Sequence, residues 1–290
     1  MTQSPLDPFA ILAAVGVTDA TAATPVSGGQ DTAIWRVEHG GMVSALRVFR
    51  PEQARMCRHE QAAMRIAVAG GLPVPEVRAG GVWQERPALL LSWCPGRTLL
   101  DVLQTQPWRI PALGLAFGRM QARIHAVSAA TLHSHRGDWI SWAGPDEMPL
   151  QEHLRALNPR MDALLHGDYH PLNVMADGAR IAGVLDWPNA LAGDPRADLA
   201  RTFAILRYPP GLRTNRVERA AITLFLRCWW RGYQRAAGRV EGMGPFYAWA
   251  GAATVRDQEA KIGLPNCPIQ SHDLGPLRRW TAEWKRRIGI

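Results

Sequence analysis

Apolar residues recur at two different periods along the chain, and the change of period falls near residue 95. Residues 33–38 and 43–49 alternate apolar with polar side chains, which is typical of half-buried strands, and Gly40-Gly41 between them predicts a two-residue hairpin turn. Residues 51–69 have a helical pattern, and two strand-like segments, 75–81 and 86–94, come after them in the chain. We therefore predict a small, mainly antiparallel sheet with one helix against it, after a short helix beginning at Ser4-Pro5.

Beyond Gly96 the apolar residues follow the helical period. The pattern predicts helices over residues 98–104, 112–127, 148–157, 194–204, 214–236, 243–262 and 274–288. A second hairpin is expected where the apolar segments 173–177 and 180–186 flank Asp177-Gly178. The fold class is thus α+β, with a sheet lobe over residues 1–95 and a larger helical lobe over residues 96–290.

Composition places the chain among ordinary globular proteins, with 47% hydrophobic and 20% charged residues in 290. No apolar run approaches the roughly 18 residues that a membrane span requires, and the first residues lack the basic and apolar order of a secretory signal. We therefore expect a cytoplasmic protein without a membrane partner. The four cysteines are far apart and form no CxxC pair, which argues against a zinc site or a disulfide framework.

The net charge of +8 raises nucleic acid as a partner, but the basic residues are scattered, and none of their runs is longer than Lys285–Arg287. We expect a solvated surface and no nucleic-acid site. Lys261 and Lys285 are the only lysines, so 31 of the 33 basic residues are arginine. Any role of a lysine in the first 260 positions must here fall to arginine.

The densest group of polar side chains lies in residues 164–200. Asn173 follows Asp168 by five positions, and Asp186 comes thirteen later. Such an oxygen-rich trio can hold a hard divalent cation and orient a hydroxyl group. Alternatively, Asp168 and Asn173 only form turns with their own backbone. Asp186 ends an apolar strand, where a buried charge needs a cation, or else it caps a helix.

His166 and His170 bracket Asp168 and raise the alternative of a metal-dependent hydrolase centred on these three side chains. The sequence has no HExxH and no third histidine at a short offset, so we expect His166 to bond its own loop backbone. Asp194 precedes Pro195 and Asp198 lies in the next helical turn. Both are expected to be structural and to hold the loop that carries Asp186.

Taken together, HGDxxxxN, the acidic strand end thirteen residues later and GDPxxDLA resemble the aminoglycoside phosphotransferase and choline kinase-like family, which is related to the protein kinases. The resemblance implies a bilobal protein-kinase-like fold and a small-molecule kinase. Such an enzyme transfers the γ-phosphoryl group of ATP or GTP to a hydroxyl of an antibiotic, an amino alcohol or a sugar-like acceptor. It further implies Asp168 as the base, with Mg²⁺ held by Asn173 and Asp186.

The resemblance also implies nucleotide contacts. Ser27, Gly28 and Gly29 would lie over the phosphates, although a plain turn is the alternative for these residues. Backbone groups of Ser92, Trp93 and Cys94 would meet the purine edge, and His170 would act as a donor near the transferred phosphoryl group.

Arg47 is the departure from the pattern, which has a strand lysine paired with a helix glutamate, here Glu60. An arginine binds phosphate through a planar fork, so the geometry at the phosphates changes and the choice between ATP and GTP stays open. For this reason a catalytically weak, kinase-like nucleotide-binding module is a further alternative.

The acceptor is expected against the helices after Asp198. Residues 199–290 contain sixteen Arg and Lys against six Asp and Glu, a balance of +10, which argues against a polycationic acceptor. An aromatic wall for the acceptor and ordinary helix packing are the two interpretations of Trp229, Trp230, Tyr233, Phe246, Tyr247 and Trp249. The pattern identifies neither the acceptor nor the oligomeric state.

Overall fold

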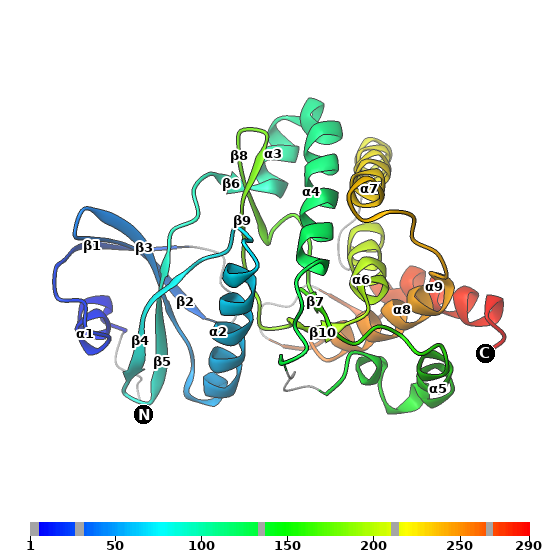
Figure 1. Cartoon of the computed structure of the whole chain (residues 1–290), viewed down its shortest axis with the longest axis horizontal. Helices are drawn as coiled ribbons and strands as arrows, with labels where there is room; N and C mark the ends of the chain where they lie inside the picture. Colours follow the sequence, from blue (N-terminus) through cyan, green and yellow to red (C-terminus); the bar gives the residue numbers. More distant parts are fainter. Residues whose placement is uncertain (1–5, 27–31, 133–136, 210–214, 265–268) are drawn as a thin grey trace. The chain divides into compact units, whose positions relative to one another are not determined.

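The computed structural model describes residues 6–26, 32–132, 137–209, 215–264 and 269–290. The chain forms two compact units (Figure 1). The first comprises Met1–Pro95 together with Gly183–Pro188, and the second comprises Gly96–Ala182 with Asn189–Ile290. The sequence pattern placed residues 183–188 in the helical lobe, whereas in the structure they pack with the first unit.

A five-stranded antiparallel sheet in the order β1-β2-β3-β5-β4 forms the first unit. The predicted hairpin is confirmed, because His39 pairs with Met42 across Gly40 and Gly41, whose φ angles of 51° and 72° suit a type I′ turn. β1 was not predicted from the sequence. The strands are β1 (Ala20–Pro25), β2 (Ala33–His39), β3 (Met42–Val48), β4 (Val77–Trp83) and β5 (Arg86–Ser92).

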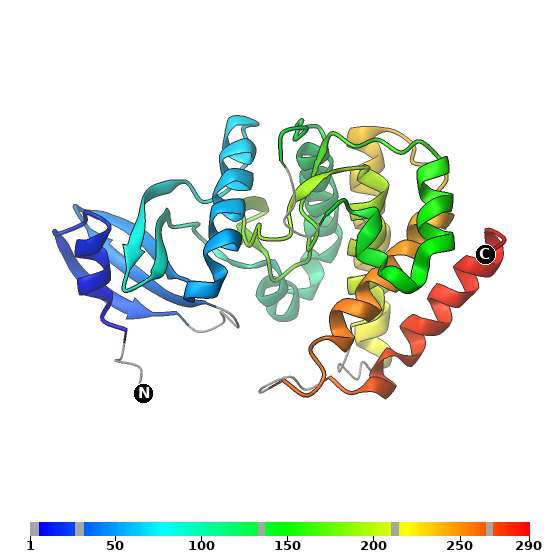
Figure 2. The same ribbon diagram turned by 90° about the horizontal axis from the view of Figure 1, so that it is seen from below.

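The two faces of this sheet are covered by different helices, as Figures 1 and 2 show. On one face, α1 (Pro8–Ala14) buries Ile11 and Leu12 against β2, β3 and β5. It begins after Asp7, whose carboxylate accepts from the N–H of Phe9 at 2.9 Å, and so starts later than expected. On the other face lies α2 (Ala54–Ala69), which follows the 3₁₀ turn η1 (Pro51–Gln53). Strand alternation turns Arg47 toward α2.

The second unit is mainly helical, as the sequence predicted. Helices α4 and α7 pack closely because Gly118 and Gly232 have no side chain. A Cβ at Gly118 would lie 2.0 Å from the Trp229 carbonyl oxygen, and one at Gly232 would lie 2.3 Å from that of Leu115. The helices are α3 (Leu99–Thr105), η2 (Pro107–Arg109), α4 (Ile110–His125), η3 (Ile140–Ala143), η4 (Pro145–Glu147), α5 (Met148–Ala156), α6 (Pro195–Arg207), α7 (Arg216–Ala237), α8 (Gly244–Glu259), η5 (Ser271–Leu274) and α9 (Gly275–Arg287).

The polar segment of residues 164–200 contains several short strands. β7 (Ala163–Leu165) pairs with β10 (Leu191–Gly193), and β6 (Arg97–Thr98) pairs with β8 (Val174–Asp177) beside β9 (Arg180–Val184). The hairpin of β8 and β9 was predicted, whereas β6, β7 and β10 were missed, because runs of two or three residues are too short to show a period.

Aromatic side chains fill the core of the second unit. Trp139 and Trp249 lie edge to face at 5.1 Å, and the Trp249 indole donates to the Trp139 carbonyl oxygen at 2.8 Å. Trp139 stacks on Phe246 at 5.6 Å. These contacts explain the Trp-rich loop before α5, for which the sequence pattern gave no structure.

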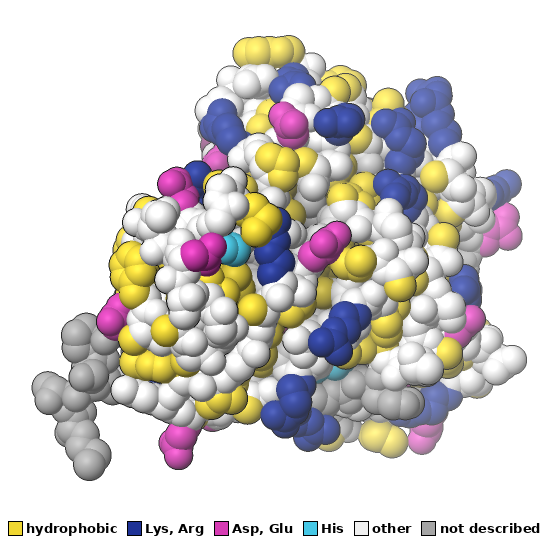
Figure 3. Space-filling view, turned by 60° about the vertical axis from the view of Figure 1, so that its left-hand side comes forward, with side chains coloured by type: hydrophobic (Ala, Val, Ile, Leu, Met, Phe, Trp, Pro, Cys, Tyr) yellow, Lys and Arg dark blue, Asp and Glu magenta, His cyan; other side chains and the backbone are white. Residues whose placement is uncertain are grey.

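The surface carries dispersed charge. Figure 3 shows Arg and Lys side chains in separate positions on the face drawn, with acidic and apolar side chains between them. Among the described helices, none combines the length and the apolar character that crossing a bilayer requires.

Candidate active site

In the first unit, Arg47 joins two acidic side chains from distant parts of the chain. Its guanidinium donates to Glu60 Oε1 at 2.5 Å and to Asp186 Oδ1 at 3.1 Å. The third nitrogen of the guanidinium, Nε, donates to Thr32 Oγ1 at 3.1 Å. Glu60 is supplied by α2 and Asp186 by the segment after β9. The arginine thus uses its fork to bridge two carboxylates, where a single ammonium group would meet fewer acceptors.

Burial and charge act in opposite directions in this trio. Burial by itself would lower the pKa of Arg47, but the charges of Glu60 and Asp186 outweigh it and the pKa is raised. The pKa of Glu60 is also raised, because burial and the nearby Asp186 outweigh the Arg47 cation. Glu60 Oε2 is buried without a hydrogen-bond partner among the described residues. Arg47 is thus a permanent cation beside a carboxylate that resists ionisation.

Asp186 lies two residues beyond β9 instead of ending the strand, and its side chain is 39% exposed. The expectation of a buried strand-end charge is therefore wrong. Its φ of 64° falls in the left-handed region. The segment is fixed on both sides, because Val184 N–H donates to Pro73 O at 2.8 Å and the Trp187 N–H donates to Glu60 Oε1 at 3.3 Å. Among the described residues no donor meets the second oxygen, Oδ2, which suits a hard cation.

The other nucleotide candidates of the first unit lie at its last strand or outside the described residues. Ser27, Gly28 and Gly29 belong to the latter group. Ser92 ends β5, and its N–H donates to Glu76 O at 2.8 Å, so this N–H is not available to a base. Trp93 and Cys94 follow as partly buried residues, and burial raises the pKa of the Cys94 thiol to about 11.

In the second unit, Asp168 lies on the loop between β7 and β8, together with His170 and Asn173. Asn173 Nδ2 donates to the Asp168 carbonyl oxygen at 3.0 Å, and the same nitrogen is 3.3 Å from His170 Nε2. His170 Nε2 is 3.5 Å from Asp168 Oδ2. The amide nitrogen of Asn173 is therefore committed to the loop, while among the described residues no donor meets its Oδ1. A carbonyl oxygen presented in this way also suits a hard cation.

Asp168 is held in the ionised form. Burial alone would raise its pKa, but the hydrogen bond and charge of His170, with the charges of Arg201 and His166, lower the pKa well below the ordinary value. Its side chain remains 27% exposed, so the carboxylate can meet a ligand. A carboxylate in this state can accept a proton from a hydroxyl group.

His166 takes the role expected from the sequence. It is fully buried, and its Nδ1 accepts from the N–H of Asp168 at 3.3 Å. Over the described ranges, no three His, Cys, Asp or Glu side chains are placed to hold a metal ion. His166, Asp168 and His170 therefore do not form a three-ligand set, which removes the support for the hydrolase alternative.

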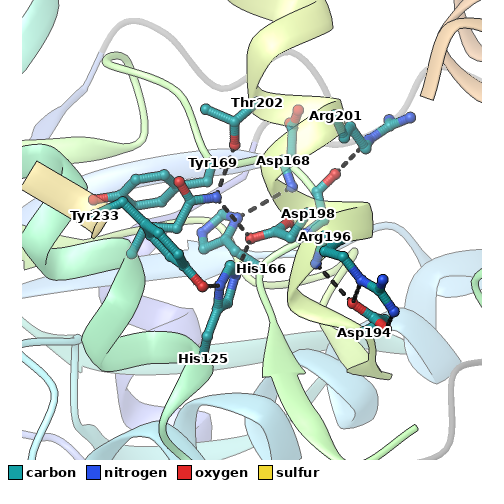
Figure 4. Close-up of polar contacts among 12 residues, drawn as sticks. His125, His166, Asp168, Tyr169, Asp194, Arg196, Asp198, Arg201, Thr202 and Tyr233 are labelled. Carbon is teal, nitrogen blue, oxygen red and sulfur yellow. Dashed lines mark hydrogen bonds and ion pairs between the residues drawn. The ribbon is translucent and has the colours of Figure 1, made fainter. Parts of the chain in front are cut away.

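The peptide groups on either side of Gly167 are fixed by α6 (Figure 4). Asp198 Oδ1 accepts from Gly167 N–H at 2.7 Å, and Arg201 Nε donates to Gly167 O at 2.5 Å. Gly167 has a φ of 75°, which favours glycine. Asp198 therefore supports the loop of Asp168 instead of the loop of Asp186, which corrects its expected role. Asp194 caps α6 by accepting from the N–H of Arg196 at 2.9 Å.

A buried polar network extends from Asp198 to α4 and α7. His125 Nε2 lies 2.9 Å from Asp198 Oδ2, and His125 Nδ1 lies 2.9 Å from the Tyr233 hydroxyl. Gln121 donates to the same Asp198 oxygen at 3.0 Å. Sequence reasoning missed these supports. The only local signals were a histidine and a glutamine on the apolar face of a predicted helix, and their partner is more than 70 positions away.

The aromatic residues proposed as an acceptor wall belong mostly to the core. Trp229, Tyr233, Phe246 and Trp249 are buried. The Trp229 indole donates to Gln121 Oε1 at 2.8 Å. Only Trp230 and Tyr247 of the six are partly exposed, so helix packing explains most of this group.

Comparisons with known proteins identify the family and the fold of this chain. A model of the phosphotransferase enzyme family matches residues 22–238. The chain is 29% identical over 183 residues to mouse (Mus musculus) acyl-CoA dehydrogenase family member 10, a match that covers 53% of this chain and spans only 17% of that protein's length.

Solved structures that share the fold include two phosphotransferases. One is a thermostable mutant of the aminoglycoside phosphotransferase APH(4)-Ia in a ternary complex with AMP-PNP and hygromycin B, at 19% identity and a TM-score of 0.66 over 96% of this chain and 97% of that chain. The other is the macrolide 2′-phosphotransferase MphH from Brachybacterium faecium, at 19% identity and a TM-score of 0.55 over 96% and 94%.

The motif resemblance and the fold expected from it are thus confirmed. Since the family match covers most of the chain, including Arg47, the loop of Asp168 and the cap of α6, this protein belongs to the phosphotransferase enzyme family.

Proposed function

We propose that this phosphotransferase moves the γ-phosphoryl group of ATP or GTP to a hydroxyl of a small acceptor, with Asp168 as the base. The observation that supports this most is the ionised, partly exposed Asp168 on a loop whose backbone is fixed on both sides of Gly167. Phosphoryl transfer depends on positioning and on charge stabilisation, and such a loop supplies the positioning.

In the proposed reaction, an Asp168 oxygen accepts the proton of the acceptor hydroxyl. The acceptor oxygen forms a bond to the γ-phosphorus as the bond between that phosphorus and the β,γ-bridging oxygen breaks. The products are the phosphorylated acceptor and the nucleoside diphosphate, and the proton leaves through Asp168. His170, 3.5 Å from Asp168 Oδ2, is proposed as a donor near the transferred group.

The proposed metal ligands are Asn173 and Asp186. The fit rests on the Oδ1 atom of Asn173 and the Oδ2 atom of Asp186, neither of which meets a donor among the described residues. Magnesium bound to nucleotide phosphates would neutralise part of their charge. Asn173 is oriented for this by the bond from its nitrogen to Asp168 O.

The remaining nucleotide contacts are assigned to the first unit, residues 1–95. Arg47 is proposed to bind the α and β phosphates, oriented by Glu60 at 2.5 Å. Ser27, Gly28 and Gly29 are proposed to lie over the phosphates, and backbone groups of Trp93 and Cys94 to meet the base. The second unit supplies the catalytic loop and the helices against which the acceptor binds.

A catalytically weak nucleotide-binding module is the second candidate. It is favoured by the ion pair between Arg47 and Asp186 at 3.1 Å, because a carboxylate engaged by arginine binds a cation less strongly. Turnover distinguishes the two candidates, since only the enzyme forms a phosphorylated product.

The test measures nucleoside diphosphate release from ATP and from GTP, with magnesium, against a panel of hydroxylated compounds. Hygromycin B and a macrolide enter the panel from the names of the structural neighbours. Magnesium-dependent thermal stabilisation by nucleotide is measured in parallel. Stabilisation with phosphorylated product supports the kinase, stabilisation without turnover supports the module, and no nucleotide response contradicts both.

A further inference from the structure

The acidic side chains of residues 199–290, where the acceptor is expected, are all engaged within the chain. Two cap helices, because Glu218 accepts from Asn215 N–H and Asp273 from Gln270 N–H, each at 2.9 Å. The other four pair with arginine: Asp257 with Arg201, Glu259 with Arg278, Glu283 with Arg287 and Glu241 with Arg239, at 2.5–3.1 Å. This segment has sixteen basic residues for these six acids. A polycationic acceptor would therefore have to compete with an arginine or with a helix cap for each of these carboxylates.

One cation lies directly behind the catalytic loop. Arg201 is 5% exposed, and two of its nitrogens are used, Nε by Gly167 O and Nη2 by Asp257 Oδ2. The third nitrogen, Nη1, is buried and has no hydrogen-bond partner in the described part of the chain. A charged donor left in this state is costly, so an acceptor oxygen placed there would be bound strongly.

Arg201 and Asp168 also share a side of the loop. Arg201 donates to the carbonyl oxygen of Gly167, the residue directly before Asp168. Figure 4 shows the Arg201 guanidinium and the Asp168 side chain on the same side of the buried network. The charge of Arg201 is one of the causes that lower the pKa of Asp168. An anionic group near Arg201 would therefore bring the rest of its molecule close to the proposed base.

We propose that the acceptor alcohol carries a carboxylate or phosphate group, and that Arg201 binds this group beside Asp168. The inference rests on the proposed function and names its acceptor class. The carboxylate or phosphate provides the oxygen that Nη1 lacks, and arginine is suited to planar, charge-assisted recognition of either.

The test uses three probes that share a hexopyranose ring and differ in charge: glucuronate, glucose and glucosamine. Thermal stabilisation and inhibition or acceleration of nucleotide turnover are measured for each, with magnesium and nucleotide present. We expect glucuronate to act at concentrations about tenfold or more below the other two, as a charge-assisted hydrogen bond implies. An equal response to all three, a lack of any response, or a stronger response to glucosamine overturns the inference.

Two variants change the glucuronate response in opposite directions. Arg201→Gln should remove the preference, and Asp257→Asn should strengthen it, because the guanidinium loses its neutralising partner. If the first variant does not fold, the second still decides. Arg65→Gln, which removes an exposed arginine of α2 outside the segment where the acceptor is expected, is the control and should keep the wild-type preference. The same preference in all three variants overturns the role of Arg201. Thermal stabilisation by magnesium and nucleotide is also measured without any acceptor. If this stabilisation is absent, the proposed function is contradicted and not the role of Arg201.

Discussion

Asp198 accepts a hydrogen bond from the backbone N–H of Gly167 at 2.7 Å, one residue before the proposed base. Arg201, one helical turn further along α6, holds the carbonyl oxygen of the same glycine at 2.5 Å. The position of Asp168 is therefore set by two side chains of α6 that are 31 and 34 positions from Gly167, and the loop backbone has little freedom to move.

Gly167→Ala should disturb this loop more than an ordinary glycine substitution. The φ of 75° costs an L-residue about 1–2 kcal/mol, and the new Cβ would lie 2.4 Å from the Asn189 carbonyl oxygen, which adds about 1–3 kcal/mol of overpacking. Gly178→Ala is the matched control, since Gly178 has a φ of 57° and open space around its Cβ position. Urea unfolding measures both. Equal losses would mean that Gly167 matters only for its dihedral angle.

Asp168→Asn should lower the turnover number by about 10²–10⁴-fold, because the amide cannot accept the acceptor proton. Nucleotide affinity should change little. The turnover number is measured by steady-state kinetics, and the nucleotide dissociation constant by titration monitored through intrinsic fluorescence. Asp177→Asn, at an exposed position at the end of β8, is the control. Full activity in Asp168→Asn would refute the assignment of the base.

Arg47→Ala should destabilise the first unit by about 3–5 kcal/mol, because it leaves the buried Glu60 without its cation. Arg47→Lys should fold better yet change the nucleotide dissociation constant severalfold, because one ammonium group replaces a fork that meets Glu60, Asp186 and Thr32. Arg36→Ala removes a partly exposed pair with Glu38 and should cost at most about 1 kcal/mol. Unchanged nucleotide affinity in Arg47→Lys would exclude Arg47 as a phosphate contact.

Most of the fold could be predicted from the sequence, because it is expressed locally. The alternation around Gly40-Gly41 and the helical period of α4 and α7 each identify an element without long-range information. β7 and β10 could not be found in this way, since each has three residues and is defined only by its partner. The expected helix start at Ser4-Pro5 lies outside the described residues, and α1 begins at Pro8 after Asp7, a pair with the same cap signature.

The candidate site was predictable only where a motif carries it. The acids of HGDxxxxN and GDPxxDLA stand at fixed spacing, and Arg47 was identified by its place in a strand. The partners of these residues were not predictable, because Arg201 meets Gly167 across 34 positions and His125 meets Asp198 across 73 positions. The same limit applies to Asp186, whose partial exposure depends on where β9 ends.

Asp186→Asn should remove most of the effect of magnesium on nucleotide binding, because an amide oxygen is a weaker ligand than a carboxylate. The nucleotide dissociation constant is measured with and without magnesium in wild type and variant. The ratio of the two constants should fall about tenfold, while the constant without magnesium changes less. Asp177→Asn serves again as the control. A ratio equal to that of wild type would refute the assignment of Asp186 as a ligand.

Asp198 should make the stability of the second unit depend on pH in the acid range. Burial would raise the pKa of Asp198, but the hydrogen bond and charge of His125, with His166 and Gln121, outweigh it and the pKa is lowered. A carboxyl whose pKa is lower in the folded state stabilises that state above its unfolded pKa of about 3.9, and the contribution is lost as the pH falls toward the folded value.

The measurement is the thermal midpoint of wild type and of His125→Gln between pH 3 and pH 7. His125→Gln removes the partner that lowers the pKa of Asp198 most, so the folded pKa rises toward the unfolded value and less stability is lost on acidification than in wild type. His272→Gln changes an exposed histidine of η5 and should leave the fall of the thermal midpoint at low pH, the acid limb, as in wild type. If the acid limb of His125→Gln coincides with that of wild type, the pair of His125 and Asp198 does not set the acid stability, and the network behind Gly167 must draw its strength from its neutral hydrogen bonds.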